Sequence, residues 1–100
     1  MDLDSIEEGH LIKVNETIYR IIKITNDVEV SSDQETKDFT AIELIKEKEG
    51  NLRPTNQINF YPDSGELYLF DLDIGRNGIF VLKNKTKLKK GDLENVALRN

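Results

Sequence analysis

Residues 17–25 read Thr-Ile-Tyr-Arg-Ile-Ile-Lys-Ile-Thr, and this stretch decides the fold class. Six of its nine residues are β-branched, and β-branched side chains favour the extended backbone of a strand. Side chains alternate between the two faces of a strand. The alternation places Ile18, Ile22 and Ile24 on one face, and we expect that face to be buried.

Short apolar runs separated by turn residues continue along the chain. Residues 17–30 and 39–48 are expected to pair as a long antiparallel hairpin, joined by the polar loop 31–38. The strongest turn signal is Pro-Asp-Ser-Gly at residues 62–65, where Gly65 suits a positive φ. Further strands are expected at residues 10–14, 57–61, 66–72 and 78–84, and residues 86–90 either continue the last of these or start another.

The sequence therefore predicts one all-β domain over residues 1–100. Six or seven short strands with turns about every 8–12 residues are typical of a small antiparallel barrel or roll, SH3-like or sandwich-like. Helical turns are expected only near the two ends, and residues 92–98 fit either a short helix or a last strand. Residues 6–24 resemble the opening hairpin of many small SH3-like or other barrels, which implies a fold type and no activity. The expected core comprises Ile18, Ile22, Ile24, Ile42, Leu44, Phe60, Leu69, Phe70, Phe80 and Leu82.

Composition excludes several classes of function. The chain has no cysteine, one histidine and a formal net charge of −5, which excludes disulfide frameworks, thiol chemistry and multi-histidine metal sites. No apolar run approaches the roughly 18 residues of a membrane span, and the acidic N-terminus lacks the basic and apolar regions of a signal peptide. Near His10 the sequence offers no nucleophile or orienting partner for catalysis. We therefore expect an acidic, cytoplasmic, non-enzymatic chain without a cofactor.

Positive charge is concentrated near the C-terminus. Residues 1–75 carry 17 acidic and 7 basic side chains, whereas residues 76–100 carry 2 acidic and 7 basic ones. Alternating lysines on one extended strand would point the same way, about 6.6–6.8 Å apart. Such a strip suits a polyanion such as nucleic acid, an edge strand protected against aggregation, or the acidic hairpin of this chain or of a twin subunit. The strip comprises Lys83, Lys85, Lys87, Lys89 and Lys90.

Two expected strands are apolar on both faces. In residues 66–72, for example, Tyr68 and Phe70 alternate with two leucines. A sheet with one face in water should alternate cleanly between apolar and polar residues, so a second apolar face indicates tight curling, a covering helix or a partner subunit. The expected oligomer or partner face comprises Tyr68, Phe70, Phe80 and Leu82.

Acidic residues support two weaker alternatives. Asp71, Asp73 and Asn77 alternate along a turn as in a calcium loop, but the sixth and twelfth positions of an EF-hand are Arg76 and Leu82 here. Hydrogen bonds from these side chains to their own backbone explain the same turn. A second acidic group would suit a nucleic-acid mimic that occupies a basic groove on a protein, and it comprises Asp27, Glu29, Asp33, Glu35 and Asp38.

These patterns predict an interaction module that self-associates, as in a homodimer, or forms a subunit of a protein assembly. The alternatives are a binder of nucleic acid or another polyanion through residues 83–90, and the acidic mimic. No membrane partner is expected.

Overall fold

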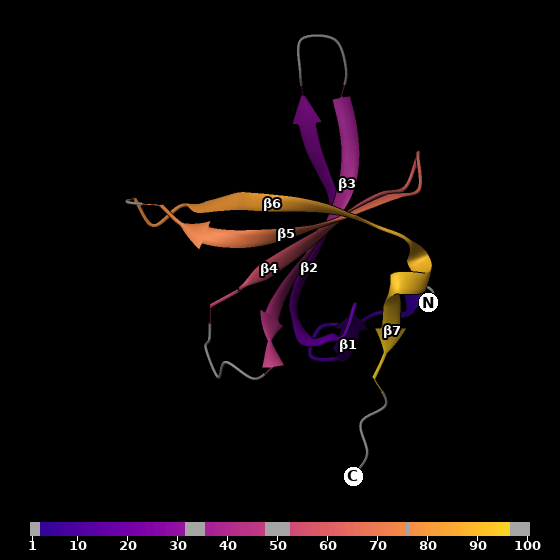
Figure 1. Cartoon of the computed structure of the whole chain (residues 1–100). Coiled ribbons are helices and arrows are strands. Elements are labelled where there is room, and N and C mark those ends of the chain that lie inside the picture. The colour runs from indigo at the N-terminus through magenta and orange to yellow at the C-terminus, as the bar shows by residue number, and fades with distance from the viewer. Residues whose placement is uncertain (1–2, 32–35, 48–52, 76, 97–100) are drawn as a thin grey trace.

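Seven antiparallel strands form one sheet that curls into a half-barrel (Figure 1). The computed structural model describes residues 3–31, 36–47, 53–75 and 77–96. The order of the strands in the sheet is β6-β5-β4-β3-β2-β1-β7, which confirms the all-β prediction. The strands are β1 (Leu11–Val14), β2 (Thr17–Ser31), β3 (Thr36–Lys46), β4 (Asn56–Tyr61), β5 (Glu66–Ile74), β6 (Phe80–Leu88) and β7 (Leu93–Asn95).

Helical structure in the described residues is limited to short 3-10 turns, η1 (Leu3–Ser5) and η3 (Lys90–Asp92) among them. Within these same residues, no helix has the length and apolar character needed to cross a membrane.

Tight turns explain why consecutive strands are neighbours in the sheet. Val14 pairs with Thr17, so β1 and β2 are joined by only two residues. Those residues, Asn15 and Glu16, both have positive φ (44° and 77°), as a type I′ hairpin requires. The predicted turn at residues 62–65 is also present: Gly65 has φ 75° and its N–H donates to the carbonyl of Tyr61 at 2.8 Å.

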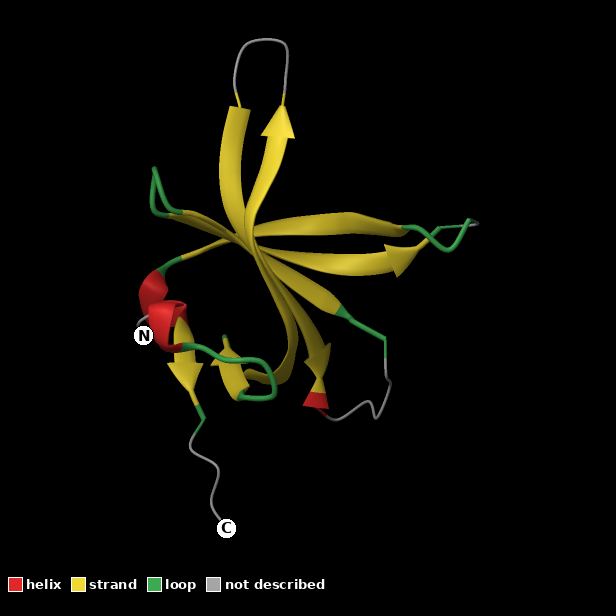
Figure 2. Ribbon diagram, turned by 180° about the vertical axis from the view of Figure 1, so that it is seen from behind, coloured by secondary structure: helices red, strands yellow, loops and turns green. Residues whose placement is uncertain are grey.

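The C-terminal segment closes the open side of the curl (Figure 2). After β6 the chain passes through η3 and then pairs as β7 with β1. Leu88 and Leu93, on either side of η3, are 4% and 2% exposed, so both pack into the core. The ambiguity over residues 92–98 is thus resolved in favour of a strand for Leu93–Asn95, while residues 97–98 lie outside the described part.

The core lies on the inner face of the curl. Ile42 and Leu44 are buried as predicted, and Ile24, Phe60 and Leu69 pack against the core with partial exposure. The main cluster comprises Ile12, Val14, Tyr19, Ile21, Ile42, Leu44, Ile58, Leu67, Leu88 and Leu93.

The predicted buried face of β2 is wrong in its first half. Ile21 pairs with Leu44 and Lys23 pairs with Glu43, so Ile22 is an extra residue, a β-bulge. A bulge reverses the alternation of side chains on either side of it. Consequently Ile21 is fully buried, whereas Ile18 is 39% exposed.

Phe80 and Leu82 are also not core residues, since each is 42% exposed. The cause is strand length. β4 begins at Asn56, opposite Asp71, and β5 and β6 extend beyond that point without a third strand beside them.

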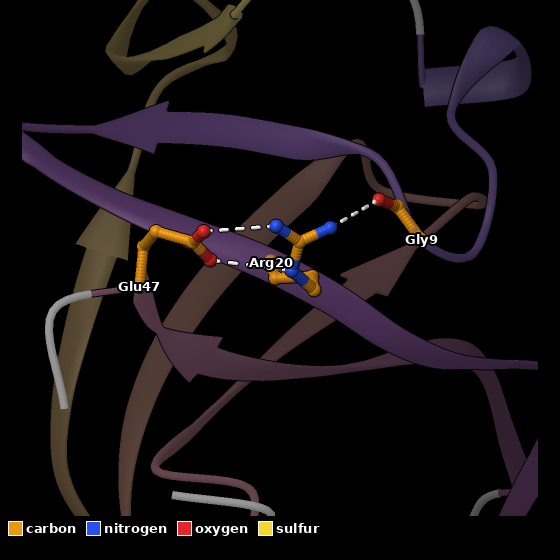
Figure 3. Close-up of polar contacts among 3 residues, drawn as sticks. All are labelled: Gly9, Arg20 and Glu47. Atoms are coloured by element: carbon orange, nitrogen blue, oxygen red, sulfur yellow. Dashed lines mark hydrogen bonds and ion pairs between the residues drawn. The ribbon is translucent and has the colours of Figure 1, made fainter. Parts of the chain in front are cut away.

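Arg20 joins three parts of the chain on the outside of the sheet (Figure 3). Its guanidinium donates to both carboxylate oxygens of Glu47, at 2.8 and 3.2 Å, and to the carbonyl of Gly9 at 3.0 Å. A planar guanidinium suits this two-pronged contact. The end of β3 and the turn before β1 are therefore both tied to β2.

Candidate interaction surface on the β5–β6 arm

The distal halves of β5 and β6 project from the body of the sheet (Figures 1 and 2). We call residues 70–74 and 80–84 the arm. The N–H of Leu72 in β5 donates to the carbonyl of Thr55, in the segment before β4, at 2.9 Å. Among the described residues, no third strand pairs with β5 and β6 beyond this point.

One face of the arm is apolar. Leu72 pairs with Leu82 and Ile74 pairs with Phe80 across the two strands, and Phe70 precedes Leu72 on the same face because side chains two residues apart share a face. Ile74 is 41% exposed, similar to Phe80 and Leu82. We call this set the apolar strip, and it comprises Phe70, Leu72, Ile74, Phe80 and Leu82.

The structure brings together the four residues that the sequence predicted as a partner face. Tyr68 lies two residues before Phe70 and therefore on the same face, next to the base of the apolar strip. Phe80 and Leu82 join them from β6. The register between β5 and β6 places Phe80 and Leu82 on the same face as Tyr68 and Phe70. Alternation along a single strand does not reveal this register.

The opposite face of the arm carries Val81 beside charged and amide side chains that bond to one another. The Asp71 carboxylate accepts hydrogen bonds from the Asn56 and Asn84 amides, at 2.8 and 3.0 Å. The Asp73 carboxylate pairs with the Lys83 ammonium at 2.7 Å. The Lys83 ammonium, through its hydrogen bond, lowers the pKa of the Asp73 carboxyl below its ordinary value. These contacts tie β4, β5 and β6 together and fix the shape of the arm.

The arrangement does not support the calcium-loop alternative. The carboxylates of Asp71 and Asp73 already accept from side-chain donors of this chain. Within the described ranges, no three histidine, aspartate or glutamate residues are grouped to hold a metal ion.

A β-bulge in β6 divides the predicted lysine strip. Leu69 pairs with Thr86 and Asp71 pairs with Lys83, so Asn84 and Lys85 together face one residue of β5. Asn84 has φ 52°, a left-handed conformation that asparagine tolerates. The bulge leaves Lys83 on the polar face of the arm, while Lys85 and Lys87 lie on the face of the apolar strip.

The remaining two lysines do not continue the row. Lys89 follows the end of β6, where its backbone N–H donates to the Asp92 carboxylate at 2.8 Å, and Lys90 begins η3. The predicted row of lysines is therefore a pair on the outer face of β6, Lys85 and Lys87, with three lysines placed elsewhere.

Aromatic rings line the outer face beside this pair. The Lys85 ammonium lies 4.0 Å from the centre of the Tyr68 ring, a cation–π contact. The Tyr61 ring meets Tyr68 edge-on at 6.0 Å, and Phe39 follows Tyr61 at 5.3 Å. The Tyr68 hydroxyl donates to the Glu66 carboxylate, and this hydrogen bond raises the pKa of Tyr68.

A hollow on the inner face was not visible to sequence reasoning. Its volume is about 260 Å³, and it lies where β2 and β3 leave the body of the sheet. It depends on the N-terminal segment, whose Leu3 and Ile6 pack beside the sheet, a contact that no local pattern signals. The lining residues are Leu3, Ile6, Ile24, Asn26, Thr40, Ile42, Phe60 and Pro62.

Comparison of the chain with protein-family models, with curated proteins and with solved structures gave no match. Its function must therefore be inferred from its own geometry.

Proposed function

We propose that this chain is a protein-interaction module whose binding surface is the apolar strip of the arm. The observation that carries the proposal is the exposure of Ile74, Phe80 and Leu82, at 41–42% each, on one face of a projecting ribbon. Contiguous apolar side chains exposed on a folded surface mark interaction sites. The proposal gives the chain no catalytic role.

Contacts between the two strands of the arm support this function. The Asp73–Lys83 ion pair and the hydrogen bond from Asn84 to Asp71 hold the two strands in register on the face away from the apolar strip. A surface that is already ordered loses less conformational entropy when it binds. Aromatic side chains such as Phe70 and Phe80 are also suited to anchor an interface.

Binding of a polyanion is the second candidate function. Lys85 and Lys87 lie next to the aromatic row on the outer face, and proteins that bind single strands combine cations with aromatic rings in this way. Two phosphate contacts would give a log–log salt slope of only about −1.4 for a single strand. The net charge of −5 also opposes a polyanion. The apolar strip is therefore the stronger candidate.

A photo-reactive amino acid at two adjacent positions tests the proposal. Leu82 lies on the apolar strip, whereas Val81, 45% exposed, lies on the opposite face of the same strand. In cells that produce the chain naturally, we expect protein adducts from position 82 at several times the yield from position 81. Equal yields at the two positions, or none at position 82, would contradict the proposed function.

A further inference from the structure

We infer that the partner of the apolar strip is a second copy of this chain. That copy would bind the arm with its hollow and with the acidic side chains of its β2–β3 hairpin, Asp27, Glu29 and Asp38. This inference rests on the proposed function and specifies the partner. It follows from two surfaces that match in polarity and spacing and that cannot meet within one chain.

The donor surface is the outer face of the arm and of the strand that continues from it. The apolar strip ends near Leu82, and Lys87 follows on the same face. Leu82 pairs with Leu72 and Lys87 pairs with Tyr68, so the two are separated by four residues of β5, or about 13 Å. Along the outer face, the donor surface therefore consists of an apolar patch with cationic side chains beside it.

The acceptor surface lies on the inner face, at the base of the β2–β3 hairpin. The hollow is lined by apolar side chains that include Ile6, Ile24 and Ile42. Its volume of about 260 Å³ is smaller than the roughly 300–1,000 Å³ of a small-molecule pocket, and suits one or two side chains of a protein. On β3, Asp38 shares the face of Ile42 and lies four residues away, about 13 Å. The acceptor surface therefore consists of an apolar hollow with anionic side chains beside it.

The anions of the β2–β3 hairpin form no ion pair within the described residues. Glu29 pairs directly with Asp38 across β2 and β3, and like charges placed opposite each other destabilise a sheet. Among the described residues, neither these two nor Asp27 forms an ion pair, and all three are exposed. A cation supplied by another molecule would relieve the repulsion.

The lysines on the outer face of β6 likewise form no ion pair within the described residues. Lys83 already pairs with Asp73. Lys85 lies over the Tyr68 ring, and neither Lys85 nor Lys87 forms an ion pair within the described part of the chain. Both are exposed on the outer face. Their charge is opposite in sign to that of the anions on the β2–β3 hairpin.

The two surfaces cannot meet within one molecule. β3 and β6 are separated by β4 and β5, which is three strand spacings, or about 14 Å. Asp38 shares the inner face of Ile42, whereas Lys87 lies on the outer face with Tyr68. The β2–β3 hairpin and the arm also project in different directions (Figure 1). Only another copy of the chain can bring them together.

The size of the contact indicates a weak, salt-sensitive association. Stable interfaces use about 20–30 residues from each partner, far more than the five side chains of the apolar strip. Charge pairs at the rim of an interface add steering and register and are screened by salt. Because the donor and acceptor surfaces differ, the contact is either reciprocal within a dimer or continues into longer assemblies.

Charge exchange tests the inference directly. We would prepare Lys85→Glu/Lys87→Glu and Glu29→Lys/Asp38→Lys, and follow self-association by sedimentation velocity. Each double variant alone is expected to associate at least tenfold more weakly than the wild type. An equimolar mixture is expected to recover the wild-type affinity, because each variant restores the charge that the other has lost. Asp63→Lys, in the exposed β4–β5 turn, serves as the control and should associate like the wild type.

Failure of this inference is distinguishable from failure of the proposed function. Wild-type behaviour of both double variants, or a mixture that does not recover, would overturn the second copy in this arrangement. So would a monomeric wild type whose position 82 cross-links to a different protein, although the proposed function would then stand. A complex with a single-stranded oligonucleotide in place of self-association would also overturn it. Lys87→Glu and Asp38→Lys provide a single-substitution pair if circular dichroism shows that a double variant does not fold.

Discussion

At the scale of single residues, the ion pair of Asp73 and Lys83 joins the two strands of the arm and depends on the ionisation of Asp73. The two side chains lie 2.7 Å apart on the polar face, and each is more than half exposed. The Lys83 ammonium is the largest cause of the lowered pKa of Asp73, and the N–H of Ile74 lowers it further. Two strands of the arm thus share one proton-sensitive contact.

This contact predicts a pH dependence with a definite sign. A carboxyl whose pKa is lower in the folded state adds stability above its unfolded pKa, near 3.8, and that stability is lost as the pH falls through the lowered folded value. Lys83→Gln should therefore raise the pKa of Asp73 toward 3.8, measured by NMR of the carboxyl carbon. Lys87→Gln, on the other face, should leave it unchanged. Equal shifts in the two variants would show that the ion pair is not the cause.

At the scale of elements, the bulge in β6 controls which lysines face the apolar strip. Asn84 has φ 52° and donates to Asp71 at 3.0 Å. A β-branched residue there places its Cβ in conflict with the backbone and loses the hydrogen bond. We expect Asn84→Val to reduce the free energy of unfolding by about 1–3 kcal/mol in urea. Thr86→Val, at a position paired regularly with Leu69, should change it far less; equal losses would refute the role of the bulge.

Bulges also explain how far the sequence could predict this fold. The alternation in residues 17–25 identified a strand and a hairpin correctly, but the bulge at Ile22 has no local signal, and it exchanged Ile18 for Ile21 in the core. Asn84 offered a signal, because asparagine tolerates positive φ. A bulge predicted at Asn84 would have placed Lys83 on one face of β6 and Lys85 and Lys87 on the other.

The candidate site was predictable in one part and hidden in the other. The two apolar faces of their strands predict a partner face at Tyr68, Phe70, Phe80 and Leu82, and the strand register places these four residues on one face. The hollow was not predictable, because it needs the N-terminal segment to pack beside β2, β3 and β4. Contacts between distant segments leave no periodic pattern in a sequence.

At the scale of the whole molecule, the apolar residues divide into a core that holds the fold and a strip that the fold does not need. Two leucines near the C-terminus show the contrast. Leu93 is 2% exposed and joins β7 to the core where the curl closes, whereas Leu82 is 42% exposed on the arm. The same substitution at the two positions should therefore have different consequences.

Leu93→Ala should reduce the free energy of unfolding by about 2–5 kcal/mol, because a buried leucine leaves a cavity. In a chain of 100 residues that loss should lower the melting temperature by about 8 °C or more. Leu82→Ala should stay within about 0.5 kcal/mol of the wild type, as an exposed position does, while weakening self-association. Scanning calorimetry of dilute protein measures both. If Leu82→Ala destabilised the monomer as much as Leu93→Ala, the apolar strip would belong to the core of the fold, and its exposure would need an explanation other than binding.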